Sequence, residues 1–69
     1  MDSDALESAR SRYEAAYSAY LERAKHVRQK LLARMTPSAE DIEAERQARE
    51  HLAIARRELI DAINASLRR

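Results

Sequence analysis

The sequence contains no glycine and no cysteine, and its only proline is Pro37. A glycine-rich phosphate-binding loop is therefore excluded, because such loops need residues that tolerate positive φ. The lack of cysteine excludes disulfides, which are a common support for small domains. A chain of 69 residues is one domain, and it buries only about 60% of its unfolded surface. We therefore expect it to be stabilised by association with another chain.

Long apolar runs are also missing, since the longest is LAIA at residues 52–55. The first ten residues are acidic and contain no apolar segment typical of a secretory signal. These features predict no membrane span, no membrane partner and a cytoplasmic location. The formal net charge of +1 does not by itself indicate a nucleic-acid or membrane partner.

Aromatic residues are few, with no phenylalanine or tryptophan and three tyrosines, Tyr13, Tyr17 and Tyr20. Their spacing of four and three residues places all three on one face of a helix. Leu6 and Val27 belong to the same face, which favours a packed interface over an outward platform for stacking bases. We interpret the tyrosines as part of a surface that contacts another helix.

One strong helix break lies at Thr36–Ser38, around Pro37. Proline cannot donate a hydrogen bond within a helix, and it disfavours α conformation at Thr36. We therefore predict a first helix over residues 4–34, ending near Arg34 or Met35, and a second over residues 39–67. The short link between them predicts an antiparallel two-helix hairpin.

Two starts are possible for the second helix. Ser38 as N-cap with Asp41 three residues later resembles a capping box. The alternative places Thr36 at the N-cap and Pro37 at the first helical position. The choice moves the helix start by two residues.

Both helices carry heptad repeats typical of a coiled coil. In the first, one row contains Leu6, Tyr13, Tyr20 and Val27, and a row four places later contains Arg10, Tyr17, Ala24 and Leu31. In the second, alanine recurs every seven residues, which permits close helix approach. The interface is predicted at Leu6, Tyr13, Tyr17, Tyr20, Ala24, Val27, Leu31, Ala48, Leu52, Ala55, Arg56, Leu59 and Ile63.

Charge changes sign along the chain in four blocks. Residues 1–22 carry a net −3, residues 23–35 carry +5, residues 38–50 carry −3 and residues 51–69 carry +2. Folding at Pro37 brings each block beside one of opposite sign, which supports the antiparallel pairing. Two helices alone leave wide apolar faces, so we expect a homodimeric four-helix bundle or docking on a helical partner.

A basic edge formed by Arg23, Lys30 and Arg34 is the candidate contact for nucleic acid. Pairing of these residues with acidic residues across the hairpin is the favoured interpretation. The acidic residues expected to pair are Glu40, Glu43, Glu45 and Glu50. Nucleic-acid binding by a dimeric bundle is kept as an alternative.

Metal binding and catalysis find little support. Glu22, His26, Glu50 and His51 could come to a similar level, but Glu22 and His26 are expected to point away from the seam. The sequence has no cysteine and no arrangement of serine, histidine and carboxylate facing inward. We expect no cofactor, no metal and no enzymatic activity.

In length, single break and charge pattern, the chain resembles two groups of small helical hairpins. These are the repressor-of-primer proteins of plasmid copy control and the small cochaperones of type III secretion needle subunits. The resemblance implies architecture and carries no site residues. The function predicted from the sequence is a protein-interaction module, with a nucleic-acid-binding regulator and a secretion or assembly adaptor as alternatives.

Overall fold

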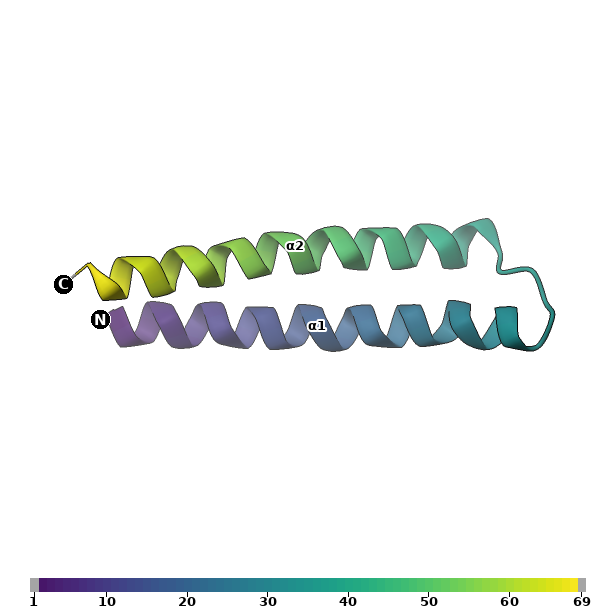
Figure 1. Cartoon of the computed structure of the whole chain (residues 1–69), viewed down its shortest axis with the longest axis horizontal. Coiled ribbons are helices and arrows are strands. Elements are labelled where there is room, and N and C mark those ends of the chain that lie inside the picture. The colour runs from purple at the N-terminus through teal and green to yellow at the C-terminus, as the bar shows by residue number, and fades with distance from the viewer. Residues whose placement is uncertain (1, 69) are drawn as a thin grey trace.

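The computed structural model describes the backbone of residues 2–68 and the side chains of residues 4–68. It contains two helices, α1 (Asp2–Leu32) and α2 (Ala39–Leu67), packed side by side and antiparallel (Figure 1). The molecule is a rod with dimensions of 53 × 14 × 13 Å, and the start of α1 and the end of α2 lie at the same end. The predicted helical hairpin is confirmed.

The first helix ends earlier than predicted, at Leu32 instead of near Arg34 or Met35. The reason is a left-handed residue, Arg34, with φ of 60°. This conformation lets the Met35 N–H donate to the Lys30 carbonyl at 2.8 Å, and the Arg34 N–H donate to the Leu31 carbonyl at 3.1 Å. Such a pair of bonds closes a helix as a Schellman motif, usually with glycine at the left-handed position. The sequence has no glycine to mark this end.

The second helix begins at the residue expected for a capping box. Ser38 is the N-cap, and its hydroxyl accepts from the Asp41 N–H at 3.1 Å. The Asp41 carboxylate accepts in return from the Ser38 N–H at 3.2 Å. The alternative start at Thr36 and Pro37 is therefore wrong. Reciprocal bonds satisfy two backbone donors that a helix start would otherwise leave unpaired.

The seam between the helices is built on alanine. Among the described residues the buried apolar side chains are Ala9, Ala48 and Ala55, and no large side chain is fully buried. The first predicted row of α1 is half-buried as expected, at Leu6, Tyr13, Tyr20 and Val27. Large side chains thus reach the seam but remain partly open to solvent.

The second predicted row of α1 needs correction. Of the row placed four residues later, Arg10, Tyr17 and Leu31 are exposed and only Ala24 is half-buried. The inward row lies three residues later and contains the buried Ala9 and the half-buried Ala16. The alanines occupy the seam because small side chains let two helix backbones approach closely.

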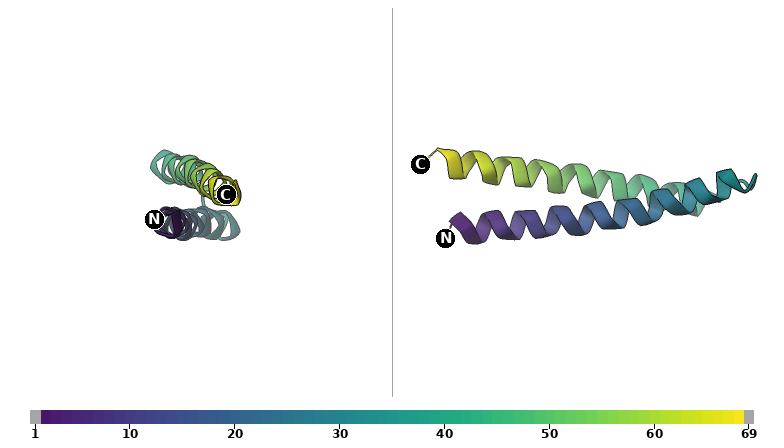
Figure 2. Two further views of the ribbon diagram at one scale, coloured as in Figure 1. Left: turned by 90° about the vertical axis from the view of Figure 1, so that its left-hand side faces the viewer. Right: turned by 60° about the horizontal axis from the view of Figure 1, so that its bottom comes forward.

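The register between the helices is marked by an ion pair. Arg12 Nε lies 3.6 Å from Glu58 Oε1 across the hairpin. This register puts Tyr13 near the level of Ala55 and Tyr20 near the level of Ala48, so that large residues of one helix face small residues of the other. The helices cross at a shallow angle, as two further views show (Figure 2). Such alternation of large and small side chains is how closely spaced helices interdigitate.

Candidate protein-binding face

The predicted interface residues divide into two groups. Eight lie along the seam of the hairpin itself, buried or half-buried, and Ala24 beside them is half-buried. The seam group is Leu6, Tyr13, Tyr20, Val27, Ala48, Leu52, Ala55 and Leu59. The remaining four are exposed: Tyr17, Leu31, Arg56 and Ile63. The seam residues pack largely within one chain, so the exposed group is the part available to another chain.

Exposed apolar side chains line up along both helices. On α1, Tyr17 and Leu21 are four residues apart, and Leu31 follows ten residues later. On α2, Ile60, Ile63 and Leu67 follow one another in steps of three and four residues, and Ile42 lies eighteen residues before Ile60. Residues separated by three or four places share one side of a helix. We call this set the apolar face, and it comprises Tyr17, Leu21, Leu31, Ile42, Ile60, Ile63 and Leu67. Their exposed fractions range from 39% at Ile63 to 76% at Leu67.

The two lines of apolar residues lie on the same side of the hairpin. Arg12 and Glu58 each precede a seam residue by one position, and they meet across one side of the molecule. Tyr17 and Ile63 each follow a seam residue by four positions, which places them on the opposite flank of their helices. In an antiparallel pair these opposite flanks meet on the other side. The side that carries the Arg12–Glu58 ion pair, which we call the polar side, therefore lies opposite the apolar face.

Four residues of the apolar face, Leu21, Ile42, Ile60 and Leu67, are absent from the predicted interface. Their spacing from Tyr17 and Ile63 was the available signal. The prediction concentrated on a few rows that repeat every seven residues, and these four residues were left out of it. Flank positions become recognisable once the seam is known to consist of alanines.

Charged residues interrupt the apolar face near its middle. On α2, Arg49 and Arg56 lie in line between Ile42 and Ile63, and both are exposed. Arg49 forms an ion pair with Glu45 one turn earlier. On α1 the same flank carries the exposed Glu14, three residues before Tyr17, and the exposed Arg10 and Arg28, seven residues before Tyr17 and after Leu21. The apolar side chains of the face are therefore interspersed with charges of both signs on α1 and with arginines on α2.

The tyrosines connect the seam to the apolar face. Tyr13 is half-buried in the seam, while Tyr17 is 45% exposed on the flank. Their ring centroids are 6.1 Å apart with planes tilted by 40°. This tilted arrangement is favourable for aromatic rings, and it fixes the position of Tyr17. Tyr17 thus presents an apolar ring with a polar hydroxyl at the edge of the face.

The exposed surface of the hairpin is large for its mass. It amounts to 5629 Å² for a chain of 7.9 kDa, whereas a compact monomer of that mass exposes about 4,400 Å². The difference of about 1,200 Å² exceeds the roughly 800 Å² that each partner buries in a standard protein interface. Exposed hydrophobic residues on an extended hairpin thus mark a candidate interface with another chain.

Asp41 joins the two helices at the loop end. Its carboxylate accepts from the Lys30 ammonium and lies 3.3 Å from His26 Nε2, in addition to its capping bond with Ser38. The hydrogen bond from Lys30 is the main cause that lowers the pKa of Asp41 to about 2, and the Ser38 backbone N–H adds to the effect. This cluster holds the loop end on the polar side of the hairpin.

The residues predicted to contact nucleic acid do not form one free basic edge. Lys30 is bound to Asp41, while Arg23 and Arg34 are exposed. The predicted pairing of this edge with acidic residues occurs through Asp41, which was not among the expected partners. Lys30 therefore has a structural role at the loop end.

Three of the acidic residues expected to pair across the hairpin instead bind arginines on their own helix. Arg46 forms ion pairs with Glu43 and Glu50, and Arg49 forms one with Glu45. The Arg46 hydrogen bond lowers the pKa of Glu43, and Glu43 in turn raises the pKa of Arg46. Pairs separated by three or four residues on a helix need no tertiary contact, which explains their preference.

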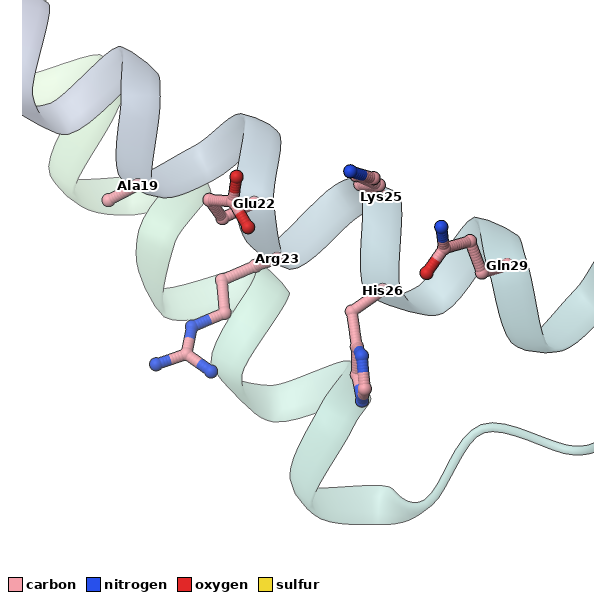
Figure 3. A pocket seen from close by; sticks show the side chains of 6 residues that line it. All are labelled: Ala19, Glu22, Arg23, Lys25, His26 and Gln29. Atoms are coloured by element: carbon pink, nitrogen blue, oxygen red, sulfur yellow. The ribbon is translucent and has the colours of Figure 1, made fainter.

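A shallow hollow of about 500 Å³ lies beside α1 and is lined by residues of that helix alone (Figure 3). Arg23 and His26 extend from it toward α2, whereas Lys25 points away. Glu22 also lines the hollow, and His26 is tied to Asp41. Across residues 4–68, no three histidine or carboxylate groups come together as a metal site would require.

Neither helix, over the residues described, combines the length and apolarity needed to cross a membrane. No protein-family model, curated protein or solved structure matches the chain. A functional proposal for this protein is therefore argued from the geometry of the apolar face.

Proposed function

We propose that the protein is a non-enzymatic protein-interaction module whose apolar face binds the helices of another chain. The observation that carries this proposal is the row of exposed tyrosine, leucine and isoleucine side chains along one side of a hairpin whose own buried residues are alanines. Exposed apolar side chains gathered on one side of a small protein mark an interaction site. Covering it would provide the large buried side chains that the hairpin lacks.

Site-specific photo-crosslinking in cells that produce the protein tests this proposal. A photoreactive residue at Leu21 or Ile63 should give covalent adducts with protein, including a second copy of the chain. The matched control is Ile54, which is 59% exposed but lies on the opposite side of α2 from the apolar face. Adducts at the face positions and none at the control are expected. Absence of adducts at both face positions would contradict the proposal.

Nucleic-acid binding makes a different prediction. Arg23→Glu combined with Arg28→Glu removes exposed basic charge from α1 while sparing Lys30, which the Asp41 cluster needs. For an interaction module, the purified chain should give no mobility shift with mixed RNA and DNA at low salt. A salt-dependent shift that disappears in the double variant would instead favour the nucleic-acid regulator.

A further inference from the structure

We infer that the chain covering the apolar face is a second copy of this protein, packed face to face about a two-fold axis parallel to the helices, with both loops at one end. The inference rests on the proposed function and identifies the partner that the face binds. Area, length and charge each support a second copy. A two-fold dimer is also the commonest symmetric assembly of identical chains.

The area to be covered fits a homodimer. Each hairpin exposes about 1,200 Å² more than a compact protein of its mass. Two copies that covered this excess in each other would bury about 2,400 Å² in total, which lies in the range of obligate homodimers. The resulting bundle would also bury large side chains that are at most half-buried in one hairpin.

The length of the face matches the length of the chain's own helices. On α2 the face extends from Ile42 to Leu67, which at a rise of about 1.5 Å per residue spans roughly 38 Å. A partner that covers both ends of the face therefore needs helices of about this length. The helices of a second copy are 31 and 29 residues long, so one copy covers the whole face of the other.

One pair of opposite charges on the face, Glu14 and Arg56, favours this orientation. The ion pair between Arg12 and Glu58 places Glu14 of α1 at about the height of Arg56 on α2. An axis parallel to the helices preserves height and lays α1 of one copy beside α2 of the other. Glu14 of each copy then meets Arg56 of the other, with Arg49 two turns away.

The opposite orientation is less favourable. With the loops at opposite ends and equal helices side by side, Arg49 of one copy would approach Arg56 of the other, because the middle of α2 lies between them. Laying α1 against α2 in that orientation would make them parallel and bring blocks of like charge together. Like charges brought together across an interface cost more free energy than pairs of opposite charge gain. Charge therefore acts mainly by disfavouring the wrong orientation.

Sedimentation velocity of the full chain, from micromolar to millimolar concentration, measures the association. The expected species is a dimer, and Leu21→Glu should raise its dissociation constant by at least about tenfold, because a carboxylate would be buried in the face. The matched control, Ile54→Glu, adds the same charge at an exposed aliphatic position on the opposite side of α2 from the face. It should dimerise like the wild type.

A charge swap tests the orientation without placing charge in an apolar contact. Glu14→Arg and Arg56→Glu should each weaken self-association, and an equal mixture of the two variants should restore dimers of mixed composition. The controls Glu22→Arg and Arg57→Glu carry the same charge changes away from the face, and their mixture should gain nothing over each alone. Because Glu14 and Arg56 are exposed in the hairpin, neither substitution removes a buried contact.

Each part of the inference has its own contradicting result. A folded monomer at millimolar concentration would contradict the inference that the partner is a second copy. Photo-crosslinks from Leu21 to a different protein would leave the proposed function standing. A wild-type dimer unaffected by Leu21→Glu shows that the face is not the interface. Failure of the mixed charge-swap variants to associate overturns the orientation with both loops at one end.

Discussion

At the scale of single residues, Asp41 makes the contacts that matter most for the stability of the fold. It closes the capping box of α2 with Ser38 and binds Lys30 of α1. One carboxylate therefore stabilises a helix start and the pairing of two helices. Its lowered pKa means that the folded hairpin holds Asp41 ionised in preference to the unfolded chain.

This linkage predicts acid sensitivity. The pKa falls from 3.8 in the unfolded chain to about 2 in the hairpin, so the stabilisation is complete above the unfolded value and is lost as the pH falls toward the folded one. Asp41→Asn should unfold at lower temperature at neutral pH and should lose less further stability between these two pH values than the wild type. Thermal unfolding followed by circular dichroism measures both effects.

The matched control is Asp61→Asn, an exposed aspartate on the same helix. It should keep the acid sensitivity of the wild type. Equal losses of stability on acidification in the Asp41 and Asp61 variants would show that the Asp41 cluster does not contribute.

Arg34 is the second residue with a testable energetic role, since a non-glycine residue there adopts φ of 60°. The left-handed region costs roughly 1–2 kcal/mol for a residue with a Cβ, and glycine's extra freedom in the unfolded chain offsets part of any gain. Arg34→Gly should therefore raise the free energy of unfolding by about 0.5–1 kcal/mol. Urea unfolding at one fixed protein concentration measures it. Arg34→Ala, which keeps a Cβ, should bring no such gain, and equal gains in both variants would contradict the explanation.

At the scale of the helices, the seam requires alanine. Ala55 is 6% exposed near the level of Tyr13, so a larger side chain there would force α1 and α2 apart. Ala55→Leu should lower the free energy of unfolding by about 1–3 kcal/mol. Ala15→Leu adds the same atoms at an exposed position of α1 and should have little effect. An Ala55→Leu variant as stable as the wild type would disprove close packing at this level.

Much of the arrangement of the two helices could be predicted from the sequence. Pro37 and the four charge blocks were sufficient for the antiparallel hairpin, and Ser38 with Asp41 marked the start of α2. The end of α1 could not be read because a left-handed arginine leaves no sequence signal of the kind glycine gives. The inward row of α1 was ambiguous because the apolar residue lies three places after Leu6, four places after Tyr20 and Val27, and at both spacings after Tyr13. Alanine occupies the inward row because its small side chain lets the two helix backbones pack at close range.

At the scale of the whole molecule, the candidate site could be predicted only in part. Tyr17, Leu31, Arg56 and Ile63 lie on the exposed side as an intermolecular contact requires. The other predicted interface residues belong to the hairpin's own seam or, like Ala24, border it. The repeat of seven has the same form whether the facing helix belongs to the same chain or to another, so the sequence alone could not separate these two cases.

The position of the chain ends has a consequence for how such a rod would be used. The start of α1 and the end of α2 lie together, opposite the loop (Figure 1). In a dimer with both loops at one end, the starts of both α1 helices and the ends of both α2 helices lie together at the opposite end of the bundle. Any domain joined to either end would be held beside its twin at high effective concentration, so two weak binding sites could act as one strong one.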